Sequence, residues 1–127
     1  MVDTPVVGLW PYARAMTDCL FCRIVAGEIP ATLVAETDRV IAFRDIAPKA
    51  PVDVLVVPKL HVANVTEVAA QIPDVLAEMV AVAQQVADAE CGGEFRLVFN
   101  SGEAAGQTVF HAHAHVMGGK HLAWEDA

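Results

Sequence analysis

The most constraining feature of this sequence is a run of alternating histidine and alanine residues, His111-Ala112-His113-Ala114-His115. Successive side chains of an extended chain point to opposite faces, so a strand here places the three imidazoles on one face and the two alanines on the other. Three of the five histidines of the chain then share one surface. Because histidine gathers at functional sites, we interpret this face as a site rather than as a set of buried structural rings.

A glycine-containing loop over residues 101–107 leads directly into this strand, which we expect to span residues 108–117. Glycines let the backbone approach a ligand closely, and successive N–H groups in such a loop can bind an anion. Asn100 and Thr108, at the two ends of the loop, add side-chain donors. The loop and the histidine face together predict a site for a small phosphate-containing ligand.

The overall charge limits the kind of partner that the chain can bind. A formal net charge of −8 argues against general nucleic-acid binding, which needs a basic face for the phosphates. No run approaches about 18 consecutive apolar residues, so we expect no membrane span. Residues 1–18 lack the basic start and apolar run of a secretory signal, and the three cysteines are an odd number. We therefore expect a reducing, cytoplasmic location and no disulfide framework.

The remaining segments predict an α+β fold, with helices packed on a mostly antiparallel sheet. A short helix is expected over residues 20–26, with Asp18 as its N-cap and Gly27 after its end. A helical segment is expected over residues 65–90, with Pro73 at the first turn of its main part. Val75, Met79, Val82 and Val86 form the apolar stripe of that helix. The expected strands before the histidine strand span residues 32–36, 40–44, 53–57 and 95–100.

The pair Cys19-Leu20-Phe21-Cys22 has a spacing that is common in zinc sites and redox sites. Thioredoxin-like chemistry needs a βαβ context, which the sequence does not show. Zinc needs two further ligands, and His61 with one histidine of the alternating run would complete a Cys₂His₂ set. Two cysteines that bind nothing remain the alternative at this point.

The segment 106–117 resembles the signature of the histidine-triad (HIT) family, in which three histidines alternate with hydrophobic residues. The motifs over residues 43–48 and 57–59, and Gly118-Gly119 with Trp124, resemble the Hint branch of that family. The similarity covers about residues 18–126. It implies that residues 16–127 form a HIT domain, a homodimer with an α+β fold that has one short N-terminal helix and one long helix. Residues 1–15 are then an extension, which we expect to be disordered or loosely docked.

The resemblance also implies an activity, the hydrolysis of purine nucleoside 5′-phosphoramidates or related mixed phosphates. His113 becomes transiently nucleotidylated in such a reaction, with His115 and Thr108 assisting, and no catalytic cofactor is required. The implied phosphate contacts are Asn100, Gly106, Gln107, Thr108 and His115. The implied ribose and base contacts are Asp45, Ile46, Leu20, Phe21, Ile24 and Phe43. The implied structural zinc ligands are Cys19, Cys22, His61 and His111. Trp124 is expected to reach toward the site of the partner subunit.

One position departs from the family pattern. The family usually has a histidine two residues after the proline equivalent to Pro51, whereas this chain has Asp53. An aspartate behind the triad orients a triad ring or favours its protonated form. Because protonation of His113 would remove its nucleophilic lone pair, this change bears on the rate and the pH optimum.

Two other functions fit the same residues. The first is a non-catalytic purine-nucleotide-binding or interaction module, in which Asp53 has removed useful turnover. The second is a zinc-dependent hydrolase, because alternating histidines on a strand are also good metal ligands.

Overall fold

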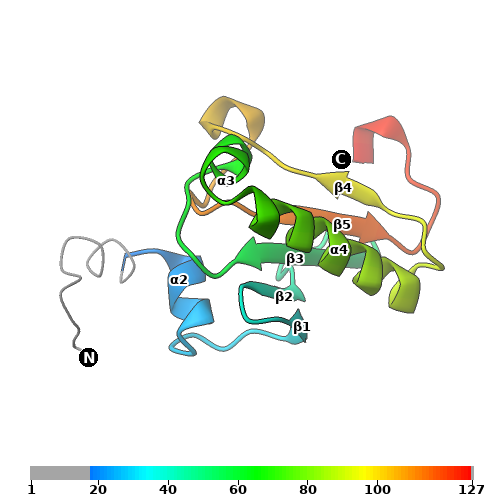
Figure 1. The fold of residues 1–127 in the computed structure, drawn as a ribbon. Helices are drawn as coiled ribbons and strands as arrows, with labels where there is room; N and C mark the ends of the chain where they lie inside the picture. The colour runs from blue at the N-terminus through cyan, green and yellow to red at the C-terminus, as the bar shows by residue number, and fades with distance from the viewer. Residues whose placement is uncertain (1–17, 127) are drawn as a thin grey trace, which may run out of the picture.

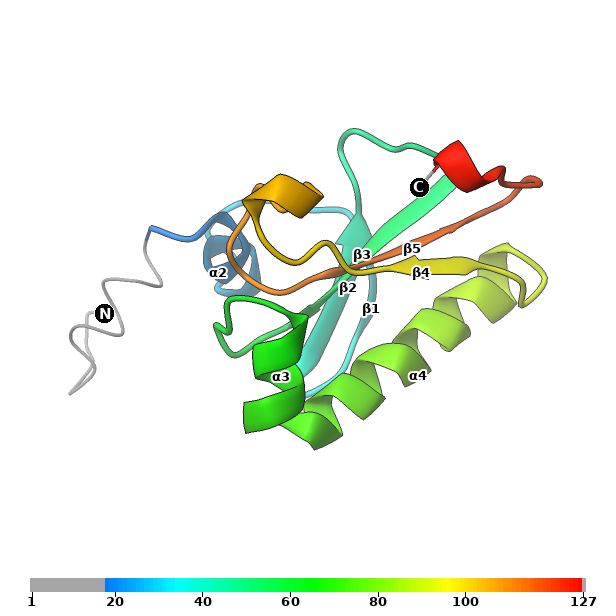
Figure 2. The same cartoon turned by 90° about the horizontal axis from the view of Figure 1, so that it is seen from above.

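The computed structural model describes residues 18–126, and the predicted extension over residues 1–15 lies outside this range. The described residues form a five-stranded antiparallel sheet in the order β1-β2-β3-β5-β4. Two helices, α3 and α4, lie on one side of the sheet, and the short helix α2 lies on the other (Figures 1 and 2). The α+β fold predicted from the sequence is therefore confirmed.

The elements follow one another in an order close to the predicted one. The strands are β1 (Leu33–Glu36), β2 (Val40–Arg44), β3 (Val52–Pro58), β4 (Arg96–Val98) and β5 (Ala114–Gly118). The helices are α2 (Leu20–Val25), α3 (Val65–Gln71) and α4 (Pro73–Glu90), and two 3₁₀ turns cover Glu103–Ala105 and Trp124–Asp126.

The long helix α4 begins at Pro73, as the sequence predicts, because a proline at the first helical position loses no hydrogen bond. The residue before it, Ile72, has φ −141° and ψ 60°, which separates α4 from the shorter helix α3. The predicted apolar stripe of α4 is buried against the sheet, and its members are Val75, Met79, Val82 and Val86. This contact forms the larger of the two apolar clusters.

The smaller cluster lies on the opposite side of the sheet, under α2. There Phe21 of α2 packs with Ile41, Phe43, Leu55 and Val57 of the neighbouring strands. Alternate residues of β2 and β3 thus serve different clusters, because a strand points successive side chains to opposite faces. The smaller cluster therefore fixes α2 against β2 and β3.

The N-cap of α2 differs from the prediction. Cys19 is the cap, and its sulfur accepts a hydrogen bond from the N–H of Cys22 at 3.4 Å, so Asp18 does not hold that position. Gly27 ends the helix as predicted, with a φ of 78° that a residue with a side chain rarely adopts. The cap is thus made by the first cysteine of the Cys-x-x-Cys pair.

The last strand is shorter than predicted, because β5 begins at Ala114 and not at residue 108. Before it, the N–H of Ala112 bonds the carbonyl of Val62 at 2.7 Å, in the loop after β3. The carbonyl of Pro58, where β3 ends, accepts a bond from the His111 ring and not from a neighbouring strand. The segment before β5 is therefore held by single contacts to the end of β3 and to the loop after it. None of the helices in residues 18–126 is long and apolar enough to span a bilayer.

Candidate active site

The alternating run places its side chains as the sequence predicts. Ala112 and Ala114 are buried in the cluster under α4, and the three imidazoles lie on the side of α2. The His113 ring meets Phe21 edge-on, with ring centroids 5.0 Å apart, and meets the His115 ring at 5.4 Å. The alternation therefore holds even where the segment is not paired as a strand.

His113 is held in one tautomer by the backbone carbonyl of His111. Its Nδ1 lies 2.9 Å from the carbonyl oxygen of His111. Because a carbonyl only accepts, Nδ1 carries the hydrogen and the lone pair of the neutral ring is on Nε2. Burial lowers the pKa of His113, while the bond to the carbonyl partly opposes that shift. The ring is thus neutral at neutral pH, with a nucleophilic Nε2 and a fixed tautomer.

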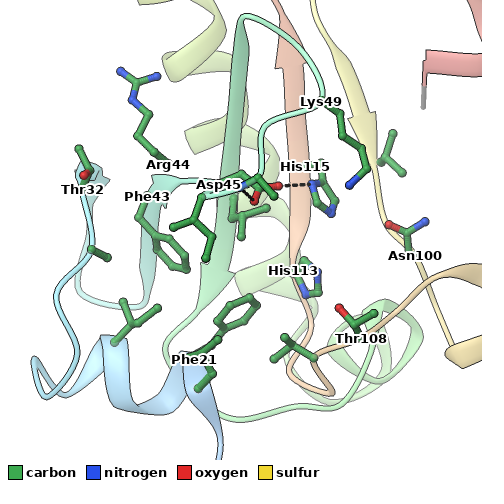
Figure 3. Close-up of a pocket in the computed structure, with 18 of the residues that line it drawn as sticks. Phe21, Thr32, Phe43, Arg44, Asp45, Lys49, Asn100, Thr108, His113 and His115 are labelled. Carbon is green, nitrogen blue, oxygen red and sulfur yellow. Dashed lines mark hydrogen bonds and ion pairs between the residues drawn. The ribbon is translucent and has the colours of Figure 1, made fainter.

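His115 faces two carboxylates on neighbouring segments. Its Nδ1 is 3.4 Å from Oδ1 of Asp53 and 3.7 Å from Oδ2 of Asp45 (Figure 3). The other oxygen of Asp53 accepts the backbone N–H of Lys49 at 3.0 Å, and this side chain is fully buried. Asp45 also accepts the N–H of Ala47 at 2.9 Å. Both carboxylates are held in place, so they orient His115 with its Nδ1–H toward them.

These groups line a cavity of about 1010 Å³. One end is apolar and aromatic, where Phe21 and Phe43 meet edge-on with centroids 5.5 Å apart. His113 lies next to Phe21 at the border of this aromatic end, and His115, Thr108 and Asn100 lie on its polar side (Figure 3). The cavity thus combines a surface for a flat ring with a polar end that contains a nucleophile.

Most of the residues that the sequence assigned to ligand contacts meet in this cavity. Those that line it are Leu20, Phe21, Ile24, Phe43, Asp45, Ile46, Asn100, Gly106, Thr108, His113 and His115. Gln107 does not line it. The buried side-chain amide of Gln107 donates to the carbonyls of Ala63 and Val109 and accepts the N–H of Gly102.

The glycine loop is ordered by these internal bonds. Asn100 donates from Nδ2 to the carbonyl of Ala105 at 3.0 Å, across the loop. Gly106 has a φ of 96°, so the turn beside Thr108 needs a residue without a Cβ atom. The loop is therefore preformed at the polar end of the cavity.

Sequence reasoning missed several residues of the cavity. Lys49 lies in a segment between Pro48 and Pro51 that reads as a simple connector, yet it lines the polar end. Arg44 lines the cavity too, but its guanidinium bonds both carboxylate oxygens of Glu90 at 2.6 and 2.8 Å. Strand alternation could have identified Leu55 and Met117. Their neighbours Val54 and Val116 point into the core under α4, so Leu55 and Met117 point to the opposite face, where the cavity lies.

A second group of polar side chains lies beside the cavity. Cys19 and Cys22 of α2 approach His61, after β3, and His111, before β5. Their four donor atoms all lie within 4.8 Å of one another. The Nδ1 of His111 is 3.4 Å from Sγ of Cys19, 3.5 Å from Sγ of Cys22 and 3.2 Å from Nδ1 of His61. The Cys-x-x-Cys pair and two histidines are thus brought together as the sequence predicts.

This group fits a tetrahedral metal ion. Zinc bonds of about 2.3 Å to sulfur and about 2.0 Å to nitrogen separate neighbouring ligands by about 3.3–3.8 Å. The Nε2 of His111 donates to the Pro58 carbonyl at 2.7 Å, which leaves the Nδ1 lone pair facing the group. Burial raises the pKa of the Cys22 thiol to about 12, so a cation is needed to hold a thiolate there.

The histidines of the triad do not converge on one point. Nδ1 of His111 faces the cysteines, Nδ1 of His113 faces a carbonyl and Nδ1 of His115 faces Asp53. In the described part of the chain, the groups that could hold a metal contain His111 or His115, and neither contains His113. This geometry does not favour a zinc ion held by the three alternating histidines together.

The fold, the alternating histidines and the cavity define a class of protein. Residues 26–122 match the model of the HIT domain, and the chain belongs to the HIT family. It is 37% identical over 107 residues to the purine nucleoside phosphoramidase of Escherichia coli K12, covering 83% of this chain and 90% of that one.

Two solved structures of the family resemble the model. A HIT family hydrolase from Legionella pneumophila superposes with a TM-score of 0.80 at 43% identity, covering 86% of this chain and 99% of the other. A zinc-bound histidine triad family protein from Mycobacterium smegmatis superposes with a TM-score of 0.72 at 32% identity, covering 86% and 82%. The resemblance drawn from the motifs is therefore confirmed.

Proposed function

We propose that this chain hydrolyses purine nucleoside 5′-phosphoramidates, or related mixed phosphates, through a nucleotide covalently bound to His113. The observation that carries the proposal is the fixed tautomer of His113, whose Nε2 lone pair belongs to a ring at the polar end of the cavity. The aromatic end of the same cavity suits a purine. The phosphoramidase relative supports this choice of substrate.

The first half-reaction forms one bond and breaks one. Nε2 of His113 attacks the α-phosphorus, and the bond from phosphorus to the amine nitrogen breaks. Thr108 guides a proton to the departing amine. When both nitrogens of His115 carry hydrogens, Nε2–H donates a hydrogen bond to a phosphoryl oxygen. Nδ1–H remains directed at the Asp53 carboxylate. The glycine loop, with Asn100 and Gly106, binds the remaining phosphoryl oxygens.

The second half-reaction restores the enzyme. Water attacks the same phosphorus, the bond to Nε2 of His113 breaks, and a nucleoside monophosphate leaves. Asp45 binds the ribose hydroxyls, and Leu20, Phe21, Ile24, Phe43 and Ile46 surround the base. None of these steps uses a metal ion.

We assign a structural zinc to Cys19, Cys22, His61 and His111, supported by their donor separations and by the zinc-bound relative. Bound there, the ion would join α2 to the segments that flank β3 and β5. Its chemistry is confined to holding two thiolates and two neutral imidazoles.

We further propose that two copies associate. Trp124 is 88% exposed and Ile46 is 98% exposed, and a contact with a second copy that covered these apolar side chains would remove their surface from water. Trp124 would reach the cavity of the partner subunit. Light scattering on the purified protein measures the oligomeric state, and a monomer at working concentration would refute this part.

The test of the proposed activity is release of AMP from adenosine 5′-phosphoramidate. His113→Ala should abolish turnover, whereas His121→Ala should not, because His121 is an exposed residue outside the cavity. Mass spectrometry of rapidly quenched protein should show one adenylyl group on the wild type and none on His113→Ala. Nucleotide binding without turnover or adduct in the wild type would point to a binding module.

A further inference from the structure

Two cationic side chains line the cavity, Lys49 and Arg44, and the proposed mechanism uses neither of them. Lys49 comes from the loop between β2 and β3, and its side chain points down into the polar end beside His115 (Figure 3). No ion pair joins its ammonium group to any residue in the described range 18–126. By contrast, Arg44 is already bonded to Glu90 and points away from the cavity.

The base of this lysine is fixed. Its backbone N–H is bonded to the buried Asp53 carboxylate, which also faces His115. The ammonium therefore extends from an anchored backbone position, while the four-carbon stem keeps the charge near solvent. A ligand in the cavity that carries a second negative charge would meet a cation without displacing another partner.

The position of Lys49 along the cavity indicates which part of a substrate it meets. In the proposed pose the base lies against Phe21 and Phe43, and His113, next to Phe21, marks the phosphorus (Figure 3). Lys49 lies beyond Asp45 and His115, on the side away from Phe21 and Phe43 (Figure 3). We place the leaving group on that side, because it departs opposite the attacking Nε2 of His113 while the nucleoside occupies the aromatic side.

We propose that Lys49 selects substrates whose amine leaving group carries a carboxylate, such as an amino acid joined to the α-phosphorus through its amino nitrogen. This inference rests on the proposed function and names the class of its leaving group. The reaction balances as before: the bond from phosphorus to nitrogen breaks, the amine takes a proton, and the amino acid leaves with its carboxylate intact.

The test compares two substrates that differ only in that charge, the adenosine 5′-phosphoramidates of glycine and of glycinamide. The wild type should show a kcat/KM for the glycine compound about fivefold higher than for the glycinamide compound, the size of a partly exposed ion pair. Added salt should lower this ratio, because exposed charges are screened. Lys49→Gln should bring it close to one, Lys49→Glu should invert it, and Lys49→Arg should keep it.

Lys59→Gln is the matched control, since Lys59 pairs with Glu36 at 2.6 Å and lies outside the cavity. Its ratio should equal that of the wild type. A wild-type ratio near one, or an equal loss on both substrates in Lys49→Gln, would overturn the inference, the latter because Lys49 would then bind the α-phosphate itself. The proposed function would survive both results. If the wild type released no AMP even from unsubstituted adenosine 5′-phosphoramidate, the proposed function would fail and this inference with it.

Discussion

Replacing Asp53 by asparagine reverses one hydrogen bond behind the triad while keeping the shape of the side chain. The amide oxygen of asparagine can still accept the N–H of Lys49, which lies 3.0 Å from the present carboxylate. The amide NH₂ then faces Nδ1 of His115, where two donors cannot bond. We expect the ring to turn a lone pair on Nδ1 toward this amide, because the Asp45 carboxylate, 3.7 Å from Nδ1, is too far to accept a hydrogen bond; the ring is then neutral and donates only from Nε2.

The expected cost follows from the kind of bond that is lost. A hydrogen bond from a charged ring is worth about 1.5–3 kcal/mol, against about 0.5–1.5 kcal/mol for a neutral one. The difference of roughly 1–2 kcal/mol at a phosphoryl oxygen lowers kcat by about tenfold. Stability should fall by only about 1 kcal/mol, because one buried bond changes and no cavity forms. Asp53→Ala should cost more, since it also leaves the buried N–H of Lys49 without an acceptor.

The assay is AMP release together with thermal unfolding and nitrogen-edited NMR of the His115 ring. Asp38→Asn is the matched control, because Asp38 is exposed in the turn between β1 and β2. If Asp53→Asn kept full kcat, or if its His115 ring still carried hydrogen on Nδ1, the reasoning about this pair would be refuted.

Three further outcomes are expected. Because burial lowers the pKa of His113, its neutral form persists below the ordinary histidine value of about 6.5; kcat/KM should hold at pH 6.5 and fall only in more acid solution. A fall that begins well above pH 7 would contradict this assignment. A strong chelator, or Cys22→Ser, should lower the melting temperature and raise KM more than it lowers kcat, whereas a catalytic metal would make kcat vanish at once. Gly118→Ala should destabilise by about 1–3 kcal/mol in chemical unfolding, because its Cβ would lie 2.7 Å from Sγ of Cys91. Cys91→Ala should recover part of that loss, and no recovery would place the strain elsewhere.

Local patterns in the sequence predicted the parts of the fold that depend on local physics. The alternation of histidine and alanine set the faces of the last segment, and Pro73 set the start of α4. Both are consequences of backbone geometry over a few residues, so no knowledge of distant contacts was needed.

The errors arose where a distant contact decides. The sequence predicts that the last strand begins at residue 108, because no local pattern shows that the N–H of Ala112 bonds the carbonyl of Val62, fifty residues earlier. The N-cap of α2 is Cys19 and not Asp18. The Cys19 sulfur also lies 3.4 Å from the His111 ring, a contact that the local sequence does not show.

The motifs predict most of the candidate site, and the structure adds residues that belong to none of these motifs. Lys49 reads as part of a connector between two prolines. Its role depends on Asp53, four residues later, which bonds its backbone. Gln107 shows the opposite case, since a polar residue in the phosphate loop serves to hold that loop together.

The strand order has a consequence for how this chain matures. Of the strands in the described residues, β5 is the last to be synthesised, yet it lies between β3 and β4. Until residues 114–118 emerge from the ribosome, both of those strands present an unpaired edge, which is the form most open to aggregation or capture by chaperones. The same segment brings the proposed nucleophile with it, because His113 directly precedes β5. A nascent chain therefore gains its proposed nucleophile only in the step that closes this sheet.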